Sequence, residues 1–591
     1  MNSIPYLAPL KDMSFAMREL GGLDRIIERH EELADGVVEV VLQEASRFAA
    51  GVLAPTNHAG DVQGCRWDAG VVHVPDSFRQ AHRAMCDAGW FGMPAPTDHG
   101  GQGMPTLVST AVLEMCKSAN LALSLCQMLT LGAIQTIVRH GSEALRRRYV
   151  APMVEGRWTG TMNLTEPQAG SDLAAIATRA APEGEHYRIT GTKIFITWGE
   201  HDMADNIVHL VLARLPDAPR GVKGISLFVC PKYLVGDDGT LGARNEVACT
   251  SIEHKLGIHA SPTATMVFGG DKGAMGWLLG KPHEGVACMF TMMNHARLNV
   301  GLEGVAIAER AYQQARAYAL ERVQGCTLGR DDGVASRAIV GHPDVRRMLM
   351  DMKARTAAAR ALAYYTAGLM DTGHDGADAK ASRRVDLLIP VVKGWCTDSA
   401  QAVAYDALQV HGGMGFVEET GVAQHVRDAR ITTIYEGTTG IQANDLIRRK
   451  LRADRGTAMR VLLDDMQADA RAWTRHGDDV IERIGTALLE ACAQLQAATQ
   501  HLLDCGERQA AASAVRMLQL TGTVVAGWLL GREAEAATAQ LAGGGDDVAF
   551  LHSRRHTALH YAAHMLAQAH AYRRMVTDGA DTVLLLDDAQ F

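Results

Sequence analysis

The chain has 591 residues, a net charge of −9, 47% hydrophobic residues and 21% charged residues. This length predicts three or four domains rather than one core, and the mildly acidic balance argues against nucleic acid as the main partner. Eleven cysteines lie scattered from Cys65 to Cys505 without a CxxC pair, which argues against a disulfide scaffold or a metal site and indicates reduced thiols in a cytoplasmic protein.

No targeting or membrane-spanning segment is expected. The first eleven residues lack the basic-then-apolar order of a signal peptide. The longest late apolar run, Met517–Leu530, is too short to cross a bilayer. We therefore expect a cytoplasmic protein, and peripheral membrane contact stays open.

The first half of the chain changes its pattern once. Residues from about 10 to 150 have apolar side chains at helical spacing, interrupted by a loop rich in Gly and Pro at Gly89–Pro105. From Trp158 to Phe268 short β-branched runs bounded by turns predict an antiparallel β domain. The predicted strands are His186–Thr197, Ile207–Leu212, Ile225–Cys230 and Thr263–Phe268.

The second half is predicted to be helical throughout. Asn294–Glu321 and Asp344–Leu369 are long and amphipathic, as in a helical bundle. A further helical segment covers about 455 to 580 and is broken by a loop at Gly543–Asp547. Its 13 basic and 18 acidic residues from 451 to 591 are unlike a nucleic-acid-binding tail. The predicted fold class is α+β, mostly α, with domains at 1–155, 156–280, 281–452 and 453–591.

The segment Ile431–Arg448 carries the clearest chemical signal. It places one carboxylate, Glu436, between Tyr435 and Gly437 at a break between two helical segments. A shielded carboxylate beside a glycine that lets a ligand approach the backbone suits a positioned general base. The alternative is a glutamate at a helix start, favoured there by the helix dipole.

Four other segments carry weaker signals. Met162–Leu173 and Lys193–Thr197 offer amides and hydroxyls that can hydrogen-bond the edge of a planar ring, although they are also ordinary turn residues. Arg297 is predicted to open a long helix that ends near Arg322 and Gln324, and arginine donors suit a pyrophosphate. In Gln409–Phe416, three glycines form a weak glycine-loop signal and His411 is interpreted as structural.

Together these segments resemble the acyl-CoA dehydrogenases, in the family's order from about residue 80 to 450. The resemblance implies a helical domain, a central β-barrel-like domain and a helical bundle, followed here by an extra C-terminal helical domain. The preface Tyr6–Met13 and this extra domain are similar to a longer bacterial branch, which includes 3-methylmercaptopropionyl-CoA and large fatty acyl-CoA dehydrogenases. The implied cofactor is FAD, with Arg322, Gln324 and the Gln409–Phe416 segment reaching the flavin nucleotide of a second subunit.

The resemblance also implies a role for each candidate residue. The residues implied to bind FAD are Met162, Leu164, Thr165, Ser171, Phe195, Thr197, Arg322, Gln324, Gln409, Gly412, Gly413, Thr438 and Gly440. The residues implied to bind the acyl-CoA are Ser171, Arg297, Tyr435, Glu436 and Arg448. Three positions depart from the family: Phe195 stands where many members have tryptophan, Gly440 where many have glutamine, and Gly325 where many have an aromatic residue.

The implied reaction is the α,β-dehydrogenation of an acyl-CoA to trans-2-enoyl-CoA, as in fatty acid β-oxidation. Glu436 would remove the α-proton while the β-hydride moves to flavin N5, and its backbone N–H would help to bind the thioester oxygen. Some relatives place the base immediately before Arg297, but that position is Ala296 here. Electrons would pass to an electron-transfer flavoprotein, and we expect a homodimer. The alternatives are an acyl-CoA oxidase, a flavin-containing DNA-binding damage-response protein, or a noncatalytic acyl-CoA-binding scaffold.

Overall fold

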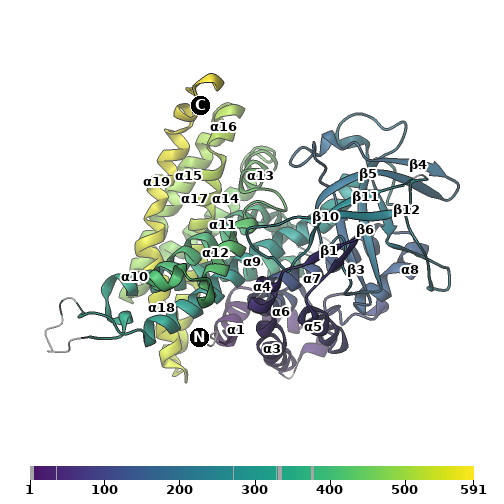
Figure 1. Ribbon diagram of the computed structural model, residues 1–591. Coiled ribbons are helices and arrows are strands. Elements are labelled where there is room, and N and C mark those ends of the chain that lie inside the picture. Colours follow the sequence, from purple (N-terminus) through teal and green to yellow (C-terminus); the bar gives the residue numbers. More distant parts are fainter. Residues whose placement is uncertain (1–4, 35, 271, 328, 330–335, 374–377) are drawn as a thin grey trace. The chain divides into compact units, whose positions relative to one another are not determined.

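The computed structural model describes residues 5–34, 36–270, 272–327, 329, 336–373 and 378–591. The chain forms two compact units, each built from several stretches. The sheet unit comprises residues 47–105 and 115–296, and the helical unit comprises residues 1–46, 106–114 and 297–591. Figure 1 shows the elements of both units.

The sheet unit contains the strands β1 (Arg66–Asp68), β2 (Val71–His73), β3 (Trp158–Asn163), β4 (Arg179–Glu183), β5 (His186–Thr197), β6 (Asn206–Arg214), β7 (Ile225–Pro231), β8 (Tyr233–Val235), β9 (Leu241–Arg244), β10 (Val247–Ile252), β11 (Thr263–Phe268) and β12 (Ala274–Leu279). Within the described residues an eight-stranded sheet has the order β10-β11-β5-β12-β7-β6-β3, and β4 pairs with β5 and β6. The four predicted runs correspond to β5, β6, β7 and β11.

The prediction of an antiparallel domain needs one correction. β3 runs parallel to β6, with Trp158 opposite Asn206 and Asn163 opposite Val211. A parallel pair needs a long crossover connection, and the chain between Asn163 and Asn206 provides one by way of β4 and β5. The sequence pattern showed the strands but contained no signal for their pairing direction.

The β1–β2 hairpin lies in a region that was predicted to be mostly helical. Its turn consists of Ala69 and Gly70, which have φ values of 47° and 88°. Two residues with positive φ between short strands are typical of a tight hairpin. Each strand is only three residues long, too short to produce a recognisable alternation.

The helices of the sheet unit are α4 (Ala54–Gln63), α5 (Asp76–Asp87), α7 (Leu121–His140) and α8 (Glu143–Val154). α7 packs directly on β3, because Gly160 has no side chain: a Cβ there would lie 2.6 Å from the Cβ of Ala133. The Gly160 N–H also donates to Thr130 Oγ1 at 3.0 Å. This contact fixes β3, and with it the start of the segment that follows Asn163.

The helical unit holds the remaining helices, some of which begin or end in the sheet unit. They are α1 (Leu10–Glu19), α2 (Leu23–Ile27), α3 (Val37–Phe48), α6 (Thr106–Ala119), α9 (Gly285–Glu321), α10 (Pro343–Thr372), α11 (Ala379–Val410), α12 (Val422–Thr432), α13 (Thr439–Asp445), α14 (Thr457–Trp473), α15 (Asp479–Asp504), α16 (Glu507–Ala512), α17 (Ala514–Ala542), α18 (Val548–Tyr561), α19 (Gln568–Thr577) and α20 (Ala580–Val583). The predicted break at Gly543–Asp547 separates α17 from α18.

α11 lies in close contact with α9 on one side and with α17 on another. A Cβ on Gly304 of α9 would lie 2.6 Å from the Cys396 carbonyl oxygen. A Cβ on Gly522 of α17 would lie 2.2 Å from the Trp395 ring. Glycine therefore allows both neighbours to approach α11 more closely than an ordinary side chain permits.

Two helices, α7 and α17, are long and apolar enough to cross a membrane by length and composition alone. However, 89% and 83% of their most apolar stretches are buried inside the protein. Core helices pass the same test, so this is weak evidence for a membrane span.

Candidate active site

Glu436 lies in a short loop between the end of α12 and the start of α13, as the sequence predicted. Its φ is 54°, in the left-handed region that non-glycine residues rarely adopt, and Gly437 follows with a φ of 88°. Gln442 Nε2 donates to the Glu436 carbonyl at 3.0 Å, and the Thr438 hydroxyl caps α13 by accepting from the Ile441 N–H at 3.2 Å. Such strain is concentrated at functional sites, where the surrounding contacts maintain it.

The environment of Glu436 makes it a stronger base than a free glutamate. Burial is the main cause that raises its pKa from 4.5 to about 7; Lys393 and Arg297 act in the opposite direction, and the negative charge of Glu303 adds to the effect of burial. A carboxyl group with a pKa near 7 is ionised in about half of the molecules at neutral pH, and it binds a proton readily once it is ionised.

Glu303 and Lys393 belong to this site although the sequence did not single them out. Glu303, on α9, is fully buried and accepts a hydrogen bond from the Tyr435 hydroxyl. Lys393, on α11, is also fully buried. Tyr435 therefore connects the loop that contains Glu436 to α9, which is a more specific role than the shielding predicted for it.

The candidate arginines have different environments. Arg297 is 5% exposed and its Nη1 lies 2.9 Å from Asp445 Oδ2 on α13. The prediction that it opens a helix was wrong: α9 begins at Gly285, because no Gly or Pro interrupts Val286–Ala296. Arg448 is instead exposed, and it pairs with Glu507 at 2.9 Å beside a pocket of about 290 Å³.

The Met162–Leu173 segment is shaped by the buried carboxylate of Glu166. Glu166 accepts from Lys193 Nζ at 2.8 Å, from the Thr178 hydroxyl at 2.6 Å and from the Ala177 N–H at 2.7 Å. Burial by itself would raise the pKa of Glu166, but Lys193 and these hydrogen bonds outweigh it and lower the pKa to about 2. Lys193 Nζ also donates to the Leu164 carbonyl at 3.0 Å, so this ion pair ties the segment to β5.

The end of β5 has an unusual backbone. Phe195 and Trp198 have φ values of 58° and 54°, and the Phe195 side chain is 58% exposed. Between them, the Thr197 carbonyl accepts from the Thr161 hydroxyl at 2.7 Å, while Trp198 Nε1 donates to the Ala122 carbonyl at 3.2 Å. An aromatic ring is thus held toward solvent beside a firmly anchored threonine.

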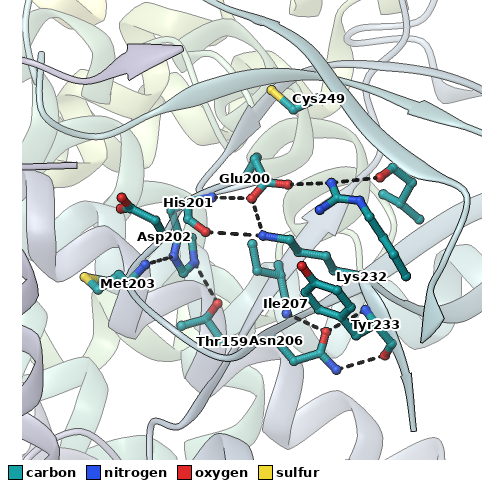
Figure 2. Close-up of polar contacts among 12 residues, drawn as sticks. Thr159, Glu200, His201, Asp202, Met203, Asn206, Ile207, Lys232, Tyr233 and Cys249 are labelled. Atoms are coloured by element: carbon teal, nitrogen blue, oxygen red, sulfur yellow. Dashed lines mark hydrogen bonds and ion pairs between the residues drawn. The ribbon is translucent and has the colours of Figure 1, made fainter. Parts of the chain in front are cut away.

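A buried polar network fixes the turn that follows β5 (Figure 2). Glu200, which is 1% exposed, accepts from Lys232 Nζ. The Met203 N–H donates to His201 Nδ1 at 3.1 Å, so the ring proton is on Nε2, which donates to Thr159 Oγ1 at 2.9 Å. Burial keeps the pKa of His201 well below its ordinary value, and the neutral ring suits this structural role.

The chain matches known protein families along most of its length. Family models described as the N-terminal, middle and C-terminal domains of acyl-CoA dehydrogenase match residues 38–157, 161–270 and 283–451. A model described as "Acetyl-CoA dehydrogenase C-terminal like" matches residues 462–587. The chain is 45% identical over 590 residues to the 3-methylmercaptopropionyl-CoA dehydrogenase of Ruegeria pomeroyi, covering 98% of this chain and 99% of that protein. The chain belongs to the acyl-CoA dehydrogenase family.

Other known proteins also match the chain over nearly its full length. The broad-specificity linear acyl-CoA dehydrogenase FadE5 of Mycobacterium tuberculosis is 35% identical, covering 99% of this chain and 100% of that protein. The solved structure of ACDH-11 from Caenorhabditis elegans aligns with a TM-score of 0.77 at 21% identity, covering 98% of this chain and 97% of that chain. These findings confirm the predicted α+β fold, the extra C-terminal helical domain and the resemblance to the longer branch.

Acyl-CoA dehydrogenases are FAD-dependent oxidoreductases, and the predicted flavin residues of the sheet unit fit a planar ring. Phe195 presents an exposed aromatic face, which suits stacking. The hydroxyls of Thr165 and Thr197 make no hydrogen bond within the described residues, and both side chains are partly exposed. Met162 is buried on β3, whereas Leu164 is partly exposed and Ser171 is exposed. Which of them contacts the flavin stays a prediction.

The residues predicted to reach the flavin nucleotide of a second subunit lie together at one end of the helical unit. His411, after α11, stacks on Tyr318 near the end of α9, with ring centroids 4.3 Å apart. This contact connects the exposed Gln409, Gly412 and Gly413 with the exposed residues just after α9, Arg322 and Gln324. Thr438 and Gly440 are elsewhere, at the start of α13 next to Glu436.

Proposed function

We propose that this acyl-CoA dehydrogenase oxidises an unbranched acyl-CoA thioester to trans-2-enoyl-CoA, with Glu436 as the general base. The observation that carries the proposal is the partly buried carboxylate of Glu436, a loop residue with a left-handed backbone. The pKa of this carboxyl group is raised to about 7. A general base works best when its pKa lies near the operating pH.

Residues of the chain contribute to the reaction by binding the thioester, by accepting its α-proton and by stabilising the charge that develops on it. Glu436 takes the α-proton of the thioester on its carboxylate and retains it as a carboxylic acid. The Glu436 backbone N–H donates to no acceptor in the part of the chain that the structure describes, so it can donate to the thioester oxygen, where negative charge develops. Bound FAD supplies the two-electron oxidation by accepting the β-hydrogen as hydride.

The substrate and the electron acceptor are further parts of the proposal. The names of the two full-length relatives, a 3-methylmercaptopropionyl-CoA dehydrogenase and a linear acyl-CoA dehydrogenase, favour an unbranched acyl chain. We expect electrons to pass to an electron-transfer flavoprotein. The oxidase and DNA-binding alternatives gain no support, since both of these relatives are named dehydrogenases.

A homodimer is the assembly that the exposed residues favour. Arg322, Gln324, Gly412 and Gly413 are exposed in the single chain, as expected if they bind the flavin nucleotide of a second subunit. Sedimentation should give a dimer, and Arg322→Ala should weaken FAD binding. A monomer that binds FAD normally would contradict this assembly.

The decisive test of the proposed function is Glu436→Gln. The variant should keep its flavin and lose about three orders of magnitude or more in the rate of flavin reduction, the scale of a general base. The measurement is anaerobic titration of purified enzyme with saturated acyl-CoAs from short to long, including the methylthiopropionyl ester, while flavin absorbance is followed. Near-normal reduction by the variant would remove Glu436 from the mechanism.

A further inference from the structure

Lys393 is a buried cation that the proposed mechanism does not use. Its side chain is 0% exposed, and its Nζ has no hydrogen-bond partner among the described residues. An ammonium group without a partner in the protein interior is costly. The site must therefore stabilise it through the electric field of nearby charges.

The close contact of α9 with α11 places Lys393 among acidic groups. A Cβ on Gly301 would lie 2.5 Å from Val392 Cγ1, and a Cβ on Gly304 would lie 2.6 Å from the Cys396 carbonyl oxygen. Glu303 lies between Gly301 and Gly304 on α9, and Lys393 lies between Val392 and Cys396 on α11. Both side chains are fully buried at this crossing.

The charged groups that act on Lys393 come from three elements. They are Glu436 of the catalytic loop, Glu303 and Arg297 of α9, and Asp398 of α11 itself. Glu436 and Glu303 also act on each other, so two carboxylates of like charge share this region with one ammonium.

The other charges near Lys393 have partners of their own. Arg297 is paired with Asp445 at 2.9 Å. Asp398 accepts from the Thr439 hydroxyl at 3.3 Å and from the side chain of Gln519 on α17. Glu303 accepts from the Tyr435 hydroxyl. Lys393 therefore differs from Arg297, the other cation acting on Glu436, in having no hydrogen-bond partner among the described residues.

We propose that Lys393 is a positioning residue of the base site, whose ammonium offsets the charge of Glu303 and keeps Glu436 ionised and ready to accept the substrate α-proton. This inference rests on the proposed role of Glu436. Lys393 keeps its own proton throughout, and the α-proton ends on the Glu436 carboxylate. Without Lys393, the carboxylates of Glu303 and Glu436 would repel each other, and Glu436 would hold a proton before the substrate binds.

The test is the pH at which Glu436 titrates in Lys393→Met, compared with the wild type. Infrared difference spectra against Glu436→Gln isolate the carboxylic acid band of Glu436 and need no substrate. Losing a neighbouring opposite charge should raise the midpoint by about 1–3 pH units. The rate of flavin reduction at pH 7 should then fall about fivefold or more and recover at high pH, whereas a merely structural defect would lower it equally at every pH.

A second variant tests the same balance from the opposite side. Glu303→Gln keeps Lys393 and removes the like charge, so the midpoint should fall; in the double variant Lys393→Met/Glu303→Gln it should return toward that of the wild type. Lys353→Met is the matched control, because Lys353 is a half-buried lysine on α10 whose Nζ donates to Ser553. It should leave the midpoint unchanged.

The outcomes separate this inference from the proposed function. If no acyl-CoA reduces the flavin of the wild type, the proposed substrate class fails, while the infrared titration still tests Lys393. An unchanged or lower midpoint in Lys393→Met overturns the inference. If that variant does not fold, an unchanged midpoint in Glu303→Gln overturns it.

Discussion

The raised pKa of Glu436 should make the active enzyme less stable than a variant without that charge. Burial raises this pKa from 4.5 to about 7, and one pH unit corresponds to about 1.4 kcal/mol. The folded protein thus binds the Glu436 proton more tightly than the unfolded chain does. Above pH 7 the ionised group costs the fold about 3 kcal/mol, and this cost disappears as the pH falls toward 4.5.

Glu436→Gln removes this cost without changing the shape of the side chain. At pH 8 we expect the flavin-loaded variant to melt about 2–4 °C above the wild type if the helical unit unfolds cooperatively, whereas at pH 4.5 the two should melt together. Differential scanning calorimetry at matched flavin saturation measures the difference, since bound flavin itself adds stability. Glu490→Gln is the control, because that side chain is 65% exposed. A difference that is the same at both pH values, or a less stable variant at pH 8, would refute the reasoning.

Three further results are expected. The wild-type rate of flavin reduction should rise through pH 7, so that at pH 6 only about a tenth of the plateau rate remains; a flat stopped-flow profile from pH 5 to 8 would contradict this. Phe195→Ala should weaken FAD binding by about tenfold through lost stacking, measured by fluorescence titration of the apoprotein, and an unchanged Kd would argue against the stacking. Gly304→Val should lower the free energy of unfolding by about 1–3 kcal/mol, because its Cβ would lie 2.6 Å from the Cys396 carbonyl oxygen; Gly170→Val, with open space around its Cα, should have little effect in the same melting assay.

The loop that contains Glu436 could be predicted from sequence because its signal is local. Tyr435, Glu436 and Gly437 are adjacent in the chain, and the break between α12 and α13 follows from the same few residues. The four predicted β runs were also local, since each is a single β-branched segment. The pairing direction of β3 and β6 was not local, because it depends on the path of the chain between them.

The residues that tune Glu436 could not be found in this way. Glu303 and Lys393 lie on long helices, where a charged residue usually faces solvent. Their burial depends on the close approach of α9 to α11, which in turn depends on Gly301 and Gly304. A sequence contains those glycines, but it does not show which helix they face. The motif at Arg297 likewise does not mark the start of α9, because Val286–Ala296 contains no Gly or Pro and continues the helix toward Gly285.

The contact between α11 and α17 has a consequence for how proteins of this length could have arisen. Gly394 faces Leu518, where a Cβ would lie 2.8 Å from a methyl group, and Trp395 packs on Gly522. A chain that stopped after residue 452 would leave this tryptophan and its neighbours uncovered. The C-terminal segment is therefore not an appendage that could be added to a finished shorter enzyme or removed from this one. The side chains on the surface of α11 must have changed when α17 was added to the chain. Shorter relatives should therefore have different side chains at the positions of Gly394 and Trp395.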